Sequence, residues 1–384
     1  MPIDPKAFLK KLHDLDISFF AGVPDSLLED ICACISSEFD SNNHTICANE
    51  GAAIALGIGY HLATEKIPFI YFQSSGIGNA INPLLSLAYK QIYSIPMLLM
   101  IGWRGEPDIQ DEPQHMKQGK VLLSMLKLMD IPYHILEKDF SNAEKTLEQS
   151  VCDIKKFKQP QVIIIQKNTF VPKLLISQKE SIFELSREDA IKHIICSLNG
   201  SDILVSTTGK ASREVFECRS QRGESHASDF LVVGGMGHAS HIALGIAIKL
   251  KNRQVFCIDG DGAAIMHMGS LAINGTSKCN NFKHILINNG AHDSVGGQPT
   301  VGFDISFQQL ALALGYNHVN CAINLEQLQQ LLGMLKKSQG PSFLEVRVKK
   351  GARENLARPN LPPLENKKQF INFLKDGYQS KKIY

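Results

Sequence analysis

The chain has 384 residues, of which 44% are hydrophobic, and its formal net charge at pH 7 is only +2. This length and composition predict two or three domains, each with an apolar core. Because no long basic run stands out, neither nucleic acid nor an anionic membrane surface is expected as the principal partner. No apolar stretch reaches the roughly 18 to 20 residues of a membrane span.

The nine cysteines are odd in number, scattered and without C-x-x-C spacing. We interpret them as reduced thiols of a cytoplasmic protein, not as zinc ligands or a disulfide framework. The start of the chain resembles a helix and not a signal peptide. Asp4-Pro5 is a typical helix start, and an apolar stripe follows from Phe8 to Leu15.

The first half of the chain alternates apolar strand patterns with helical ones. The segment that begins Gly51-Ala52-Ala53, for example, is small and apolar throughout and predicts a helix. Near-continuous apolar strands separated by helices indicate a parallel sheet covered on both faces. The expected strands are residues 17–22, 45–48, 69–73, 97–102, 133–136 and 162–166.

The second half repeats this alternation after an interruption. A linker is expected at residues 171–185, where Pro172 and a mixed polar stretch break the rhythm. A new start follows at Ser186, which forms a capping-box pattern with Asp189. The predicted fold is therefore α/β, with two doubly wound parallel-sheet domains. The expected strands of the second are residues 203–206, 230–233, 255–258, 285–287, 317–320 and 343–348.

Two short polar motifs follow apolar runs in the second half. Gly260-Asp261-Gly262 comes after one run and Asn288-Asn289 after the next, with Asp261 and Asn289 28 residues apart. One crossover helix between adjacent parallel strands occupies such a length. Both motifs are therefore expected side by side at the carboxyl edge of one sheet, where open α/β sheets bind ligands.

A carboxylate and an amide oxygen that converge at this edge are the hard ligands that Mg²⁺ takes, together with waters and phosphate oxygens. The glycines beside Asp261 let the backbone approach a diphosphate closely. The alternative is that Asp-Gly and Asn-Gly are ordinary hairpin turns. Against this, each motif precedes a segment of helix length, and Ala263 to Met268 resembles a helix entry. The pair predicts a metal-bridged diphosphate site.

Three further strand ends carry candidate residues. Glu50 follows the strand at 45–48, either as an acid at a helix N-terminus or as a buried acid that hydrogen-bonds a cofactor nitrogen. Glycine-rich junctions occur at residues 73–79 and 234–238. Each is either a tight turn or a place where the backbone approaches a ligand.

The second of these junctions nearly satisfies a dinucleotide-binding fingerprint. Gly235-Met236-Gly237 follows a strand and opens a helix, and Asp259 stands about 20 residues further along. The fingerprint fails at its third glycine, where Ser240 stands, and it leaves the Asp261 and Asn289 motifs without a role. A nicotinamide-dependent oxidoreductase is therefore the weaker alternative.

Taken together, Glu50, the Gly260-Asp261-Gly262 and Asn288-Asn289 motifs and the intervening Gly235-Met236-Gly237 resemble the thiamine diphosphate-dependent 2-oxoacid decarboxylases. The resemblance covers nearly the whole chain. It implies a pyrimidine-binding domain at 1–170, a linker at 171–185 and a diphosphate-binding domain at 186–384, without the middle domain of larger members.

This shortened form is similar to the family members that decarboxylate phosphonopyruvate or sulfopyruvate. Ser74 and Gly235 depart from the pattern, because asparagine and serine are more usual there. The segments that resemble the phosphonopyruvate members most are residues 22–26, 79–83, 101–107, 111–115, 206–210 and 289–294.

The resemblance implies thiamine diphosphate and Mg²⁺ as cofactors. Asp261, Asn289 and the backbone carbonyl of Ala291 are the implied Mg²⁺ ligands. Met236, which by count alone would be a core methionine, is the implied support beneath the bent cofactor. Glu50, from the partner subunit, is implied to hydrogen-bond the pyrimidine ring, so a homodimer or larger homo-oligomer is expected. The other implied cofactor contacts are Gly76, Thr208, Gly209, Gly235, Gly260, Gly262 and Ala263.

The expected substrate is a small 2-oxoacid with a second anionic group, 3-phosphonopyruvate first and sulfopyruvate as the alternative. Ser26, Arg104, His115 and Lys117 are predicted to bind it, because a second anion needs cationic or hydroxyl donors. Single basic residues on loops are, however, often only solvated.

Histidines are the candidates for proton transfer at this site. His115 and His292 are predicted to be catalytic, with His238 as a further possibility. A relative that binds the cofactor without turnover is another alternative, disfavoured because Glu50 is present.

Overall fold

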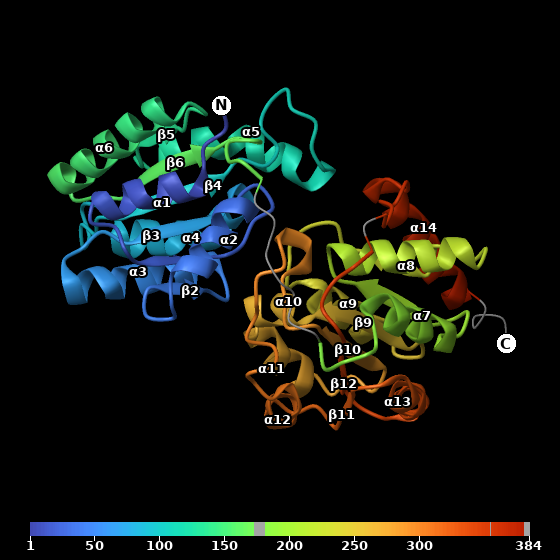
Figure 1. Cartoon of the computed structure of the whole chain (residues 1–384). Helices are drawn as coiled ribbons and strands as arrows, with labels where there is room; N and C mark the ends of the chain where they lie inside the picture. The colour runs from blue at the N-terminus through green and yellow to red at the C-terminus, as the bar shows by residue number, and fades with distance from the viewer. Residues whose placement is uncertain (173–180, 354, 380–384) are drawn as a thin grey trace. The chain divides into compact units, whose positions relative to one another are not determined.

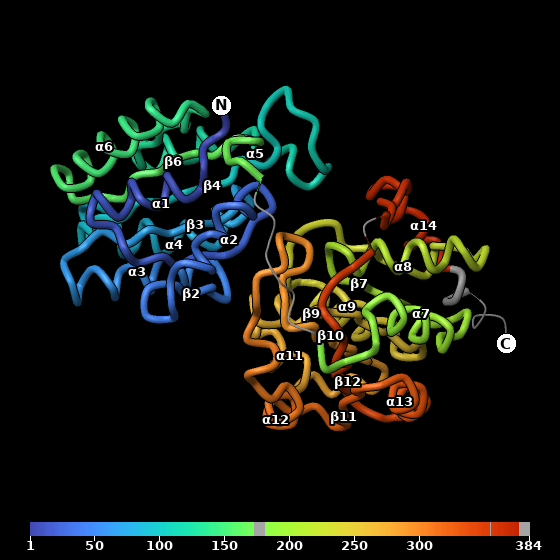
Figure 2. The backbone as a smooth tube through the Cα atoms, in the orientation of Figure 1, coloured from blue at the N-terminus to red at the C-terminus, as the bar shows by residue number. Residues whose placement is uncertain are grey.

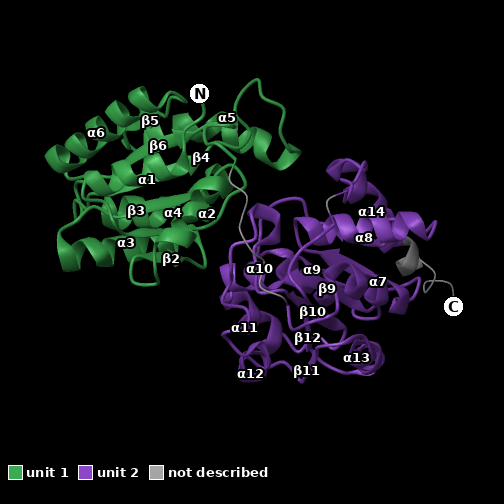
Figure 3. Cartoon of the chain, viewed as in Figure 1, with its two compact units in different colours: residues 1–178 green, residues 179–384 purple. Residues whose placement is uncertain are grey.

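The structure, a computed structural model, describes residues 1–172, 181–353 and 355–379. The chain divides into two compact units, Met1–Gln178 and Lys179–Tyr384 (Figure 3). The division falls within the predicted linker at 171–185, most of which lies outside the described residues. Across the described part of the chain, no helix has the length and apolarity needed to cross a membrane.

The first unit contains one six-stranded parallel sheet flanked by helices (Figure 1). Its strands, in the spatial order β2-β1-β3-β4-β6-β5, are β1 (Phe20–Gly22), β2 (His44–Ile46), β3 (Phe69–Gln73), β4 (Leu98–Gly102), β5 (Tyr133–Ile135) and β6 (Gln161–Ile165). Its helical elements are α1 (Pro5–Asp14), α2 (Glu29–Glu38), α3 (Glu50–Thr64), η1 (Ser74–Gly76), α4 (Ile77–Pro83), η2 (Leu84–Ala88), α5 (Pro113–Leu128) and α6 (Phe140–Phe157).

Both faces of this sheet are covered. Helices α1, α2 and α6 contribute Phe8, Ile31 and Leu147 to a core cluster on one face. Helix α3 packs on β1 and β3, with its Gly57 against Ile70, a residue outside that cluster. Burial on both faces explains why these strands are apolar nearly throughout.

The second unit contains another six-stranded parallel sheet. Its strands, in the spatial order β11-β12-β10-β9-β7-β8, are β7 (Ile203–Ser206), β8 (Asp229–Leu231), β9 (Val255–Gly260), β10 (Phe282–Asn288), β11 (His318–Ala322) and β12 (Ser342–Arg347). Its helical elements are α7 (Arg187–Ser197), α8 (Lys210–Gln221), α9 (Ala239–Lys249), α10 (Asp261–Met266), α11 (Gly269–Thr276), η3 (Asp293–Val295), α12 (Phe307–Ala313), α13 (Leu325–Lys337) and α14 (Pro363–Gln379). Helices α7, α8 and α13 share one core cluster, and α9, α11 and α12 share another.

The two units have the same topology. Counted from the start of its own unit, each sheet runs second, first, third, fourth, sixth, fifth. In a doubly wound sheet of this order, the strand order reverses between the first and third strands. Ligands bind outside the carboxyl ends of the strands at that point. These positions are β1 and β3 in the first unit and β7 and β9 in the second. The predicted fold, two doubly wound domains without a middle domain, is confirmed.

All twelve predicted strands are present, within a few residues of their predicted ends. The two predicted helix starts are also confirmed, because Asp4 and Ser186 accept backbone N–H bonds from the first turns of α1 and α7. One expectation is wrong, since no helix directly follows Asn289. Residues 289–306 instead form a loop that contains η3 and an isolated antiparallel bridge between Ala291 and Pro299.

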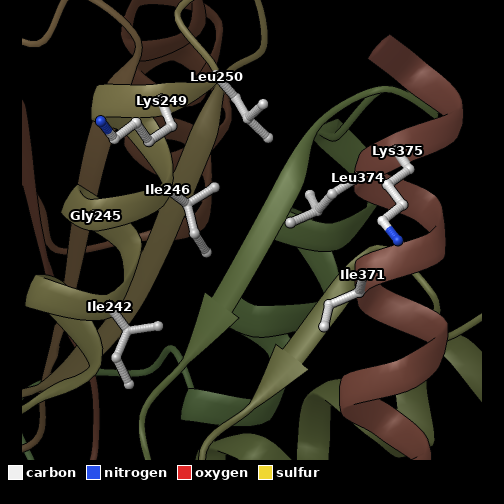
Figure 4. A pocket seen from close by; sticks show the side chains of 8 residues that line it. All are labelled: Ile242, Gly245, Ile246, Lys249, Leu250, Ile371, Leu374 and Lys375. Atoms are coloured by element: carbon white, nitrogen blue, oxygen red, sulfur yellow. The ribbon is translucent and has the colours of Figure 1, made fainter. Parts of the chain in front are cut away.

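The C-terminal helix α14 protects the edge of the second sheet. The Asn366 side chain accepts the backbone N–H of Leu231 (3.2 Å) and donates to the carbonyl of Asp229 (2.8 Å), which satisfies the exposed edge of β8. An apolar groove remains between α14 and α9, and it contains none of the predicted site residues (Figure 4). Its lining is Ile242, Gly245, Ile246, Lys249, Leu250, Ile371, Leu374 and Lys375.

Candidate functional site

The predicted site residues lie where strands of the two sheets end. In each unit they occupy segments that directly follow the carboxyl ends of parallel strands, which is the ligand-binding edge of an open α/β sheet. The segments concerned are Glu50 after β2, Gly76 after β3, Arg104 after β4, Thr208 and Gly209 after β7, Gly235 and Met236 after β8, Asp261 after β9 and Asn289 after β10.

Asp261 and Asn289 are neighbours, as their spacing predicted. Strands β9 and β10 pair in parallel with Gly260 opposite Ile287, so the motifs that follow them are level. Asp261 is the first residue of α10 and is 2% exposed. Its carboxylate accepts the backbone N–H of Asn289. The sequence motif therefore forms a local site.

The Asp261 carboxylate is buried without an ion pair among the described residues. Burial raises the pKa of Asp261 to about 6, although the Thr300 hydroxyl and nearby backbone N–H groups donate to it. A Cβ at Gly302 would lie 2.6 Å from Asp261 Oδ2, so glycine is required for this close approach. A desolvated carboxylate is stabilised by a cation, and oxygen ligands of this kind suit Mg²⁺.

The other two predicted metal ligands begin the loop after β10. Asn289 Oδ1 accepts the backbone N–H of Ala291 at 3.1 Å, and Asn289 Nδ2 donates to Asp293 Oδ2 at 2.7 Å. Gly290 between them has φ +64°, a conformation that favours glycine. Ala291 is buried and pairs with Pro299 in the isolated bridge. This tight turn keeps Ala291 beside Asn289, whose backbone N–H donates to Asp261.

Two of the predicted cofactor glycines lie in turns that follow β7 and β8. Gly209 and Gly235 both have positive φ, at +91° and +61°. Met236 is half-buried, and a Cβ at Gly262 would lie 3.3 Å from its methyl group. Ala263 is buried in α10. Met236 therefore lies against the Gly260-Asp261-Gly262 turn, as expected for a residue that supports a ligand bound there.

His292 lies beside the same turn. Its ring is within 2.9 Å of the position that a Cβ at Gly262 would take, and burial lowers its pKa to about 4. It is therefore a neutral imidazole at pH 7. His238, the further candidate, is exposed, and its ring centroid is 4.4 Å from that of His267.

The acidic residue of the dinucleotide alternative is unsuited to that role. Asp259 is 1% exposed, its Oδ1 accepts the backbone N–H of Gly260, and its Oδ2 lies 3.4 Å from His284 Nε2. His284 Nδ1 in turn contacts the Tyr316 hydroxyl at 3.0 Å. An acid that binds ribose must reach the ligand edge, whereas Asp259 points into the core.

In the first unit, Glu50 begins α3 after the N-cap Asn49. It is 5% exposed, and its Oε2 accepts Asn79 Nδ2 at 2.7 Å. A Cβ at Gly76 would lie 2.3 Å from Glu50 Oε1, so only glycine leaves room for this side chain. A helix-start acid would be expected to face solvent. The burial of Glu50 and its partner Asn79 favour the functional interpretation.

Gly76 and Gly78 offer a matched test of this packing. If Glu50 is catalytic, as the sequence predicts, Gly76→Ala should displace its carboxylate and lower kcat by about 100-fold, the usual cost of a misplaced catalytic group. Gly78→Ala meets nothing within 4 Å and should retain activity. Steady-state kinetics of both variants, with circular dichroism to verify folding, check the prediction. Equal activity of the two variants would contradict it.

The predicted substrate residues form a second cluster in the first unit. Arg104 pairs with Asp111 through Nε (2.7 Å) and Nη2, and its Nη1 donates to Ser26 Oγ at 2.6 Å. The predicted Arg104 and Ser26 are thus brought together, but Asp111 occupies two of the guanidinium donors. The pairing also keeps the pKa of Asp111 well below its usual range.

His115 and Lys117 differ in their surroundings. His115 is half-buried near the start of α5, and burial and Arg104 lower its pKa. Its Nδ1 has no hydrogen-bond partner among the described residues. Lys117 is exposed on the same helix, and none of the described side chains forms an ion pair with it. His115 therefore belongs to the cluster, whereas Lys117 lies on the surface.

Asp25 is a buried acid beside this cluster to which the sequence analysis gave no role, since it appeared there only within the segment at residues 22–26. It is fully buried after β1, where Oδ1 accepts Gln73 Nε2 at 2.6 Å and Oδ2 has no hydrogen-bond partner in the structure. Burial raises the pKa of Asp25 to about 6, although Arg104 opposes the shift. A signal was available, because an acid ends a Gly-Val-Pro-Asp-Ser turn at a strand end.

The raised pKa of Asp25 gives a prediction with a defined sign. The folded state binds the Asp25 proton more tightly than the unfolded state, so the side chain lowers stability as pH rises from about 4 to about 6. As the pH rises through this window, we expect the free energy of unfolding of Asp25→Asn to increase relative to that of wild type. The gain should reach roughly 3 kcal/mol at pH 7. Urea unfolding at pH 4 and pH 7 measures the gain. A difference that does not change with pH would contradict the assignment.

Two family models match the chain. The thiamine pyrophosphate enzyme N-terminal TPP binding domain matches residues 5–125, and the C-terminal TPP binding domain matches residues 207–346. One match lies in each structural unit. They coincide with the units that carry Glu50 and Asp261.

Three relatives resemble the chain over nearly its full length. The phosphonopyruvate decarboxylase of Streptomyces viridochromogenes is 30% identical, over 94% of this chain and 93% of its own. That of Streptomyces hygroscopicus is 29% identical, over 99% and 96%. The sulfopyruvate decarboxylase of Methanosarcina acetivorans is 26% identical, over 92% and 93%. With both TPP binding domains matched and the predicted motifs at the sheet edges, the chain belongs to the thiamine pyrophosphate enzyme family.

Proposed function

We propose that the protein is a thiamine diphosphate- and Mg²⁺-dependent decarboxylase that converts 3-phosphonopyruvate to phosphonoacetaldehyde and CO₂ in phosphonate biosynthesis. The observation that carries the cofactor assignment is the buried Asp261 carboxylate, without an ion pair among the described residues, beside Asn289. The substrate assignment is supported by the full-length similarity to two phosphonopyruvate decarboxylases.

The described residues fit the cofactor. Asp261, Asn289 and the Ala291 carbonyl would hold Mg²⁺, and the glycines at 260, 262 and 209 would let the backbone approach a diphosphate. When bound, thiamine diphosphate supplies an electron sink for the electrons released as CO₂ leaves. The protein provides binding, orientation and proton transfer.

Glu50 has the surroundings that a proton-transfer residue needs. Its carboxylate accepts a hydrogen bond from Asn79 and packs closely against Gly76. Its orientation is therefore fixed before any ligand binds. A fixed acid-base group within hydrogen-bond reach of a cofactor nitrogen can move a proton without reorganisation. His292, a neutral imidazole beside Gly262, is proposed to take part in protonating the product.

We also propose a homo-oligomer of at least two chains. Glu50 and Asp261 lie in different units, and in the decarboxylases that the sequence resembles the active site is formed between subunits. Glu50 of one subunit would then serve the Asp261 site of its partner.

The second anion of the substrate is assigned to the Arg104 cluster. Arg104 Nη1 and the Ser26 hydroxyl already meet at 2.6 Å, and both could donate to one phosphonate oxygen. His115 adds an unpartnered ring nitrogen, and Lys117 adds a positive charge at the surface. Sulfopyruvate is the second candidate substrate, because the Methanosarcina acetivorans relative is similar over nearly the whole chain.

The proposal is tested by comparing 2-oxoacids. Purified protein with thiamine diphosphate and Mg²⁺ is incubated with 3-phosphonopyruvate, sulfopyruvate and pyruvate, and the aldehyde products are trapped. We expect kcat/KM for 3-phosphonopyruvate to exceed that for pyruvate by at least about 100-fold, because pyruvate leaves the anion-binding groups unpaired. A higher kcat/KM for sulfopyruvate would reassign the substrate. If the protein turned over none of the three acids, the proposed function would be contradicted.

A further inference from the structure

Asp293 is the centre of a buried hydrogen-bond network behind Asn289. Its Oδ2 accepts Asn289 Nδ2 at 2.7 Å, Arg187 Nη1 at 2.8 Å and the backbone N–H of Gly351 at 3.1 Å. The Asp293 side chain is only 6% exposed. The sequence analysis assigned no role to Asp293 or Arg187.

Arg187 joins this network from a distant part of the sequence. It is the first residue of α7, 106 positions before Asp293, and its Nε and Nη2 form a bidentate pair with Glu214 of α8 at 2.8 and 2.9 Å. The Glu214 side chain is 1% exposed. One guanidinium is therefore buried between two carboxylates. Such a set is a costly way to stabilise a fold, which favours a role in specifying geometry.

The segment after β12 fixes the same loop from another side. The backbone N–H of Val348 donates to Asn288 O at 2.9 Å, and Lys350 Nζ donates to Gly297 O. Figure 2 follows this segment from β12 past α8 towards α14. The loop that begins at Asn289 is thus held at Asp293 and at Gly297. The Asp293 carboxylate therefore stays in place and cannot move with the Asn289 amide if that amide rotates.

An asparagine amide has two unlike ends, and its neighbour decides which end faces where. A carboxylate only accepts hydrogen bonds, so Asp293 requires the Nδ2 end of Asn289 and turns Oδ1 the opposite way. There, among the described residues, Oδ1 accepts one hydrogen bond, from the backbone N–H of Ala291 at 3.1 Å. An oxygen ligand held in one orientation loses less freedom when a metal binds.

We propose that Glu214, Arg187 and Asp293 are positioning residues that orient Asn289 Oδ1 as a Mg²⁺ ligand. Glu214 holds Arg187, Arg187 holds Asp293, and Asp293 sets the Asn289 amide. This inference rests on the proposed function, because it concerns the metal of the same site.

The test measures metal affinity as well as activity. Mn²⁺, which favours the same oxygen ligands, is titrated into full-length protein with thiamine diphosphate, and free Mn²⁺ is followed by electron paramagnetic resonance. We expect Asp293→Asn to raise the Mn²⁺ Kd by about 10- to 100-fold, the range for partners that orient a metal ligand. Arg187→Lys loses the bidentate geometry and should also raise the Mn²⁺ Kd. The milder Glu214→Gln should raise the Mn²⁺ Kd as well.

The chain offers a matched control in the same unit. Arg219 forms a bidentate pair with Asp229 at 3.0 Å on both arms and also contacts Glu224 at 2.7 Å, and none of its hydrogen bonds among the described residues reaches Asn289 or Asp293. Arg219→Lys and Asp229→Asn should lower the melting temperature like the test variants but leave the Mn²⁺ Kd within twofold of wild type.

The outcomes separate this inference from the proposed function. A wild-type protein that fails to bind Mn²⁺ with thiamine diphosphate would contradict the proposed function itself. A wild-type protein that binds both, with Asp293→Asn and Glu214→Gln unchanged in Mn²⁺ Kd, would overturn only the positioning role. An equal rise in Kd for Asp229→Asn would also overturn it, because the effect would then follow general destabilisation.

Discussion

Glu50→Gln is expected to lower kcat for decarboxylation by about 10²- to 10⁴-fold, the range for loss of a general acid-base group. The amide keeps the shape of the side chain and can still accept Asn79 Nδ2, which lies 2.7 Å from the carboxylate. Binding of Mg²⁺ and thiamine diphosphate should therefore change little. Steady-state kinetics give kcat, and isothermal titration with the cofactor gives the affinity.

A control separates this role from the electrostatics of a helix start. Glu326 is also an acid in a first helical turn, in α13, behind the N-cap Asn324, but it is exposed. Glu326→Gln removes a similar charge from a helix N-terminus and should retain full activity. Glu50→Gln with wild-type kcat would show that proton transfer does not depend on this carboxylate.

Asp261→Asn is expected to raise the Mg²⁺ Kd by at least about 100-fold and to abolish cofactor-dependent turnover at ordinary Mg²⁺ concentrations, because the site loses the one carboxylate among its three proposed protein ligands. The same variant should gain stability in the metal-free state near pH 7. Burial raises the pKa of Asp261 to about 6, so its ionised form costs free energy of folding once the pH exceeds that value. Thermal unfolding with and without Mg²⁺ measures both effects.

The matched control for Asp261 is Asp304, an exposed acid in the same loop region as Thr300. Asp304→Asn should leave the Mg²⁺ Kd and the melting temperature close to those of wild type. If Asp261→Asn still bound Mg²⁺ and thiamine diphosphate with wild-type affinity, the proposed metal site at this sheet edge would be contradicted.

The two variants can also be combined to test the proposed assembly. If Glu50 of one subunit serves Asp261 of its partner, a mixed dimer of Glu50→Gln and Asp261→Asn chains contains one site with both residues intact. Unfolding and refolding the variants together should restore up to about a quarter of wild-type activity. Mixed refolding without recovery would mean that both residues act within one chain or not in one site.

The fold could be predicted from the sequence because the signal is repeated. Apolar strand runs alternate with helical segments along both halves, and a parallel sheet buried on both faces accounts for that pattern. The predicted linker at 171–185 also contains the division between the units after Gln178. Where the pattern was not repeated, prediction failed, as in the irregular loop that follows Asn289.

The proximity of Asp261 and Asn289 was predictable because it depends on a short spacing. Asp261 and Asn289 directly follow two adjacent parallel strands, so chain topology alone brings them together. The buried positions of Asp25 and Asp293 could not be predicted, for the opposite reason. Asp25 is buried by contacts with Gln73 and Gly102, and Asp293 is held by Arg187. Contacts between segments that are distant in the sequence leave no local pattern.

The most direct test of the function is CO₂ release from 3-phosphonopyruvate by wild-type protein stripped of metal and cofactor with EDTA and dialysis. Initial rates are measured after thiamine diphosphate, Mg²⁺ or both are restored. Turnover is expected only when both are present, with one phosphonoacetaldehyde formed per CO₂. Absence of CO₂ release with both cofactors restored, or equal release without thiamine diphosphate, would contradict the proposal that this protein is a thiamine diphosphate-dependent decarboxylase of 3-phosphonopyruvate.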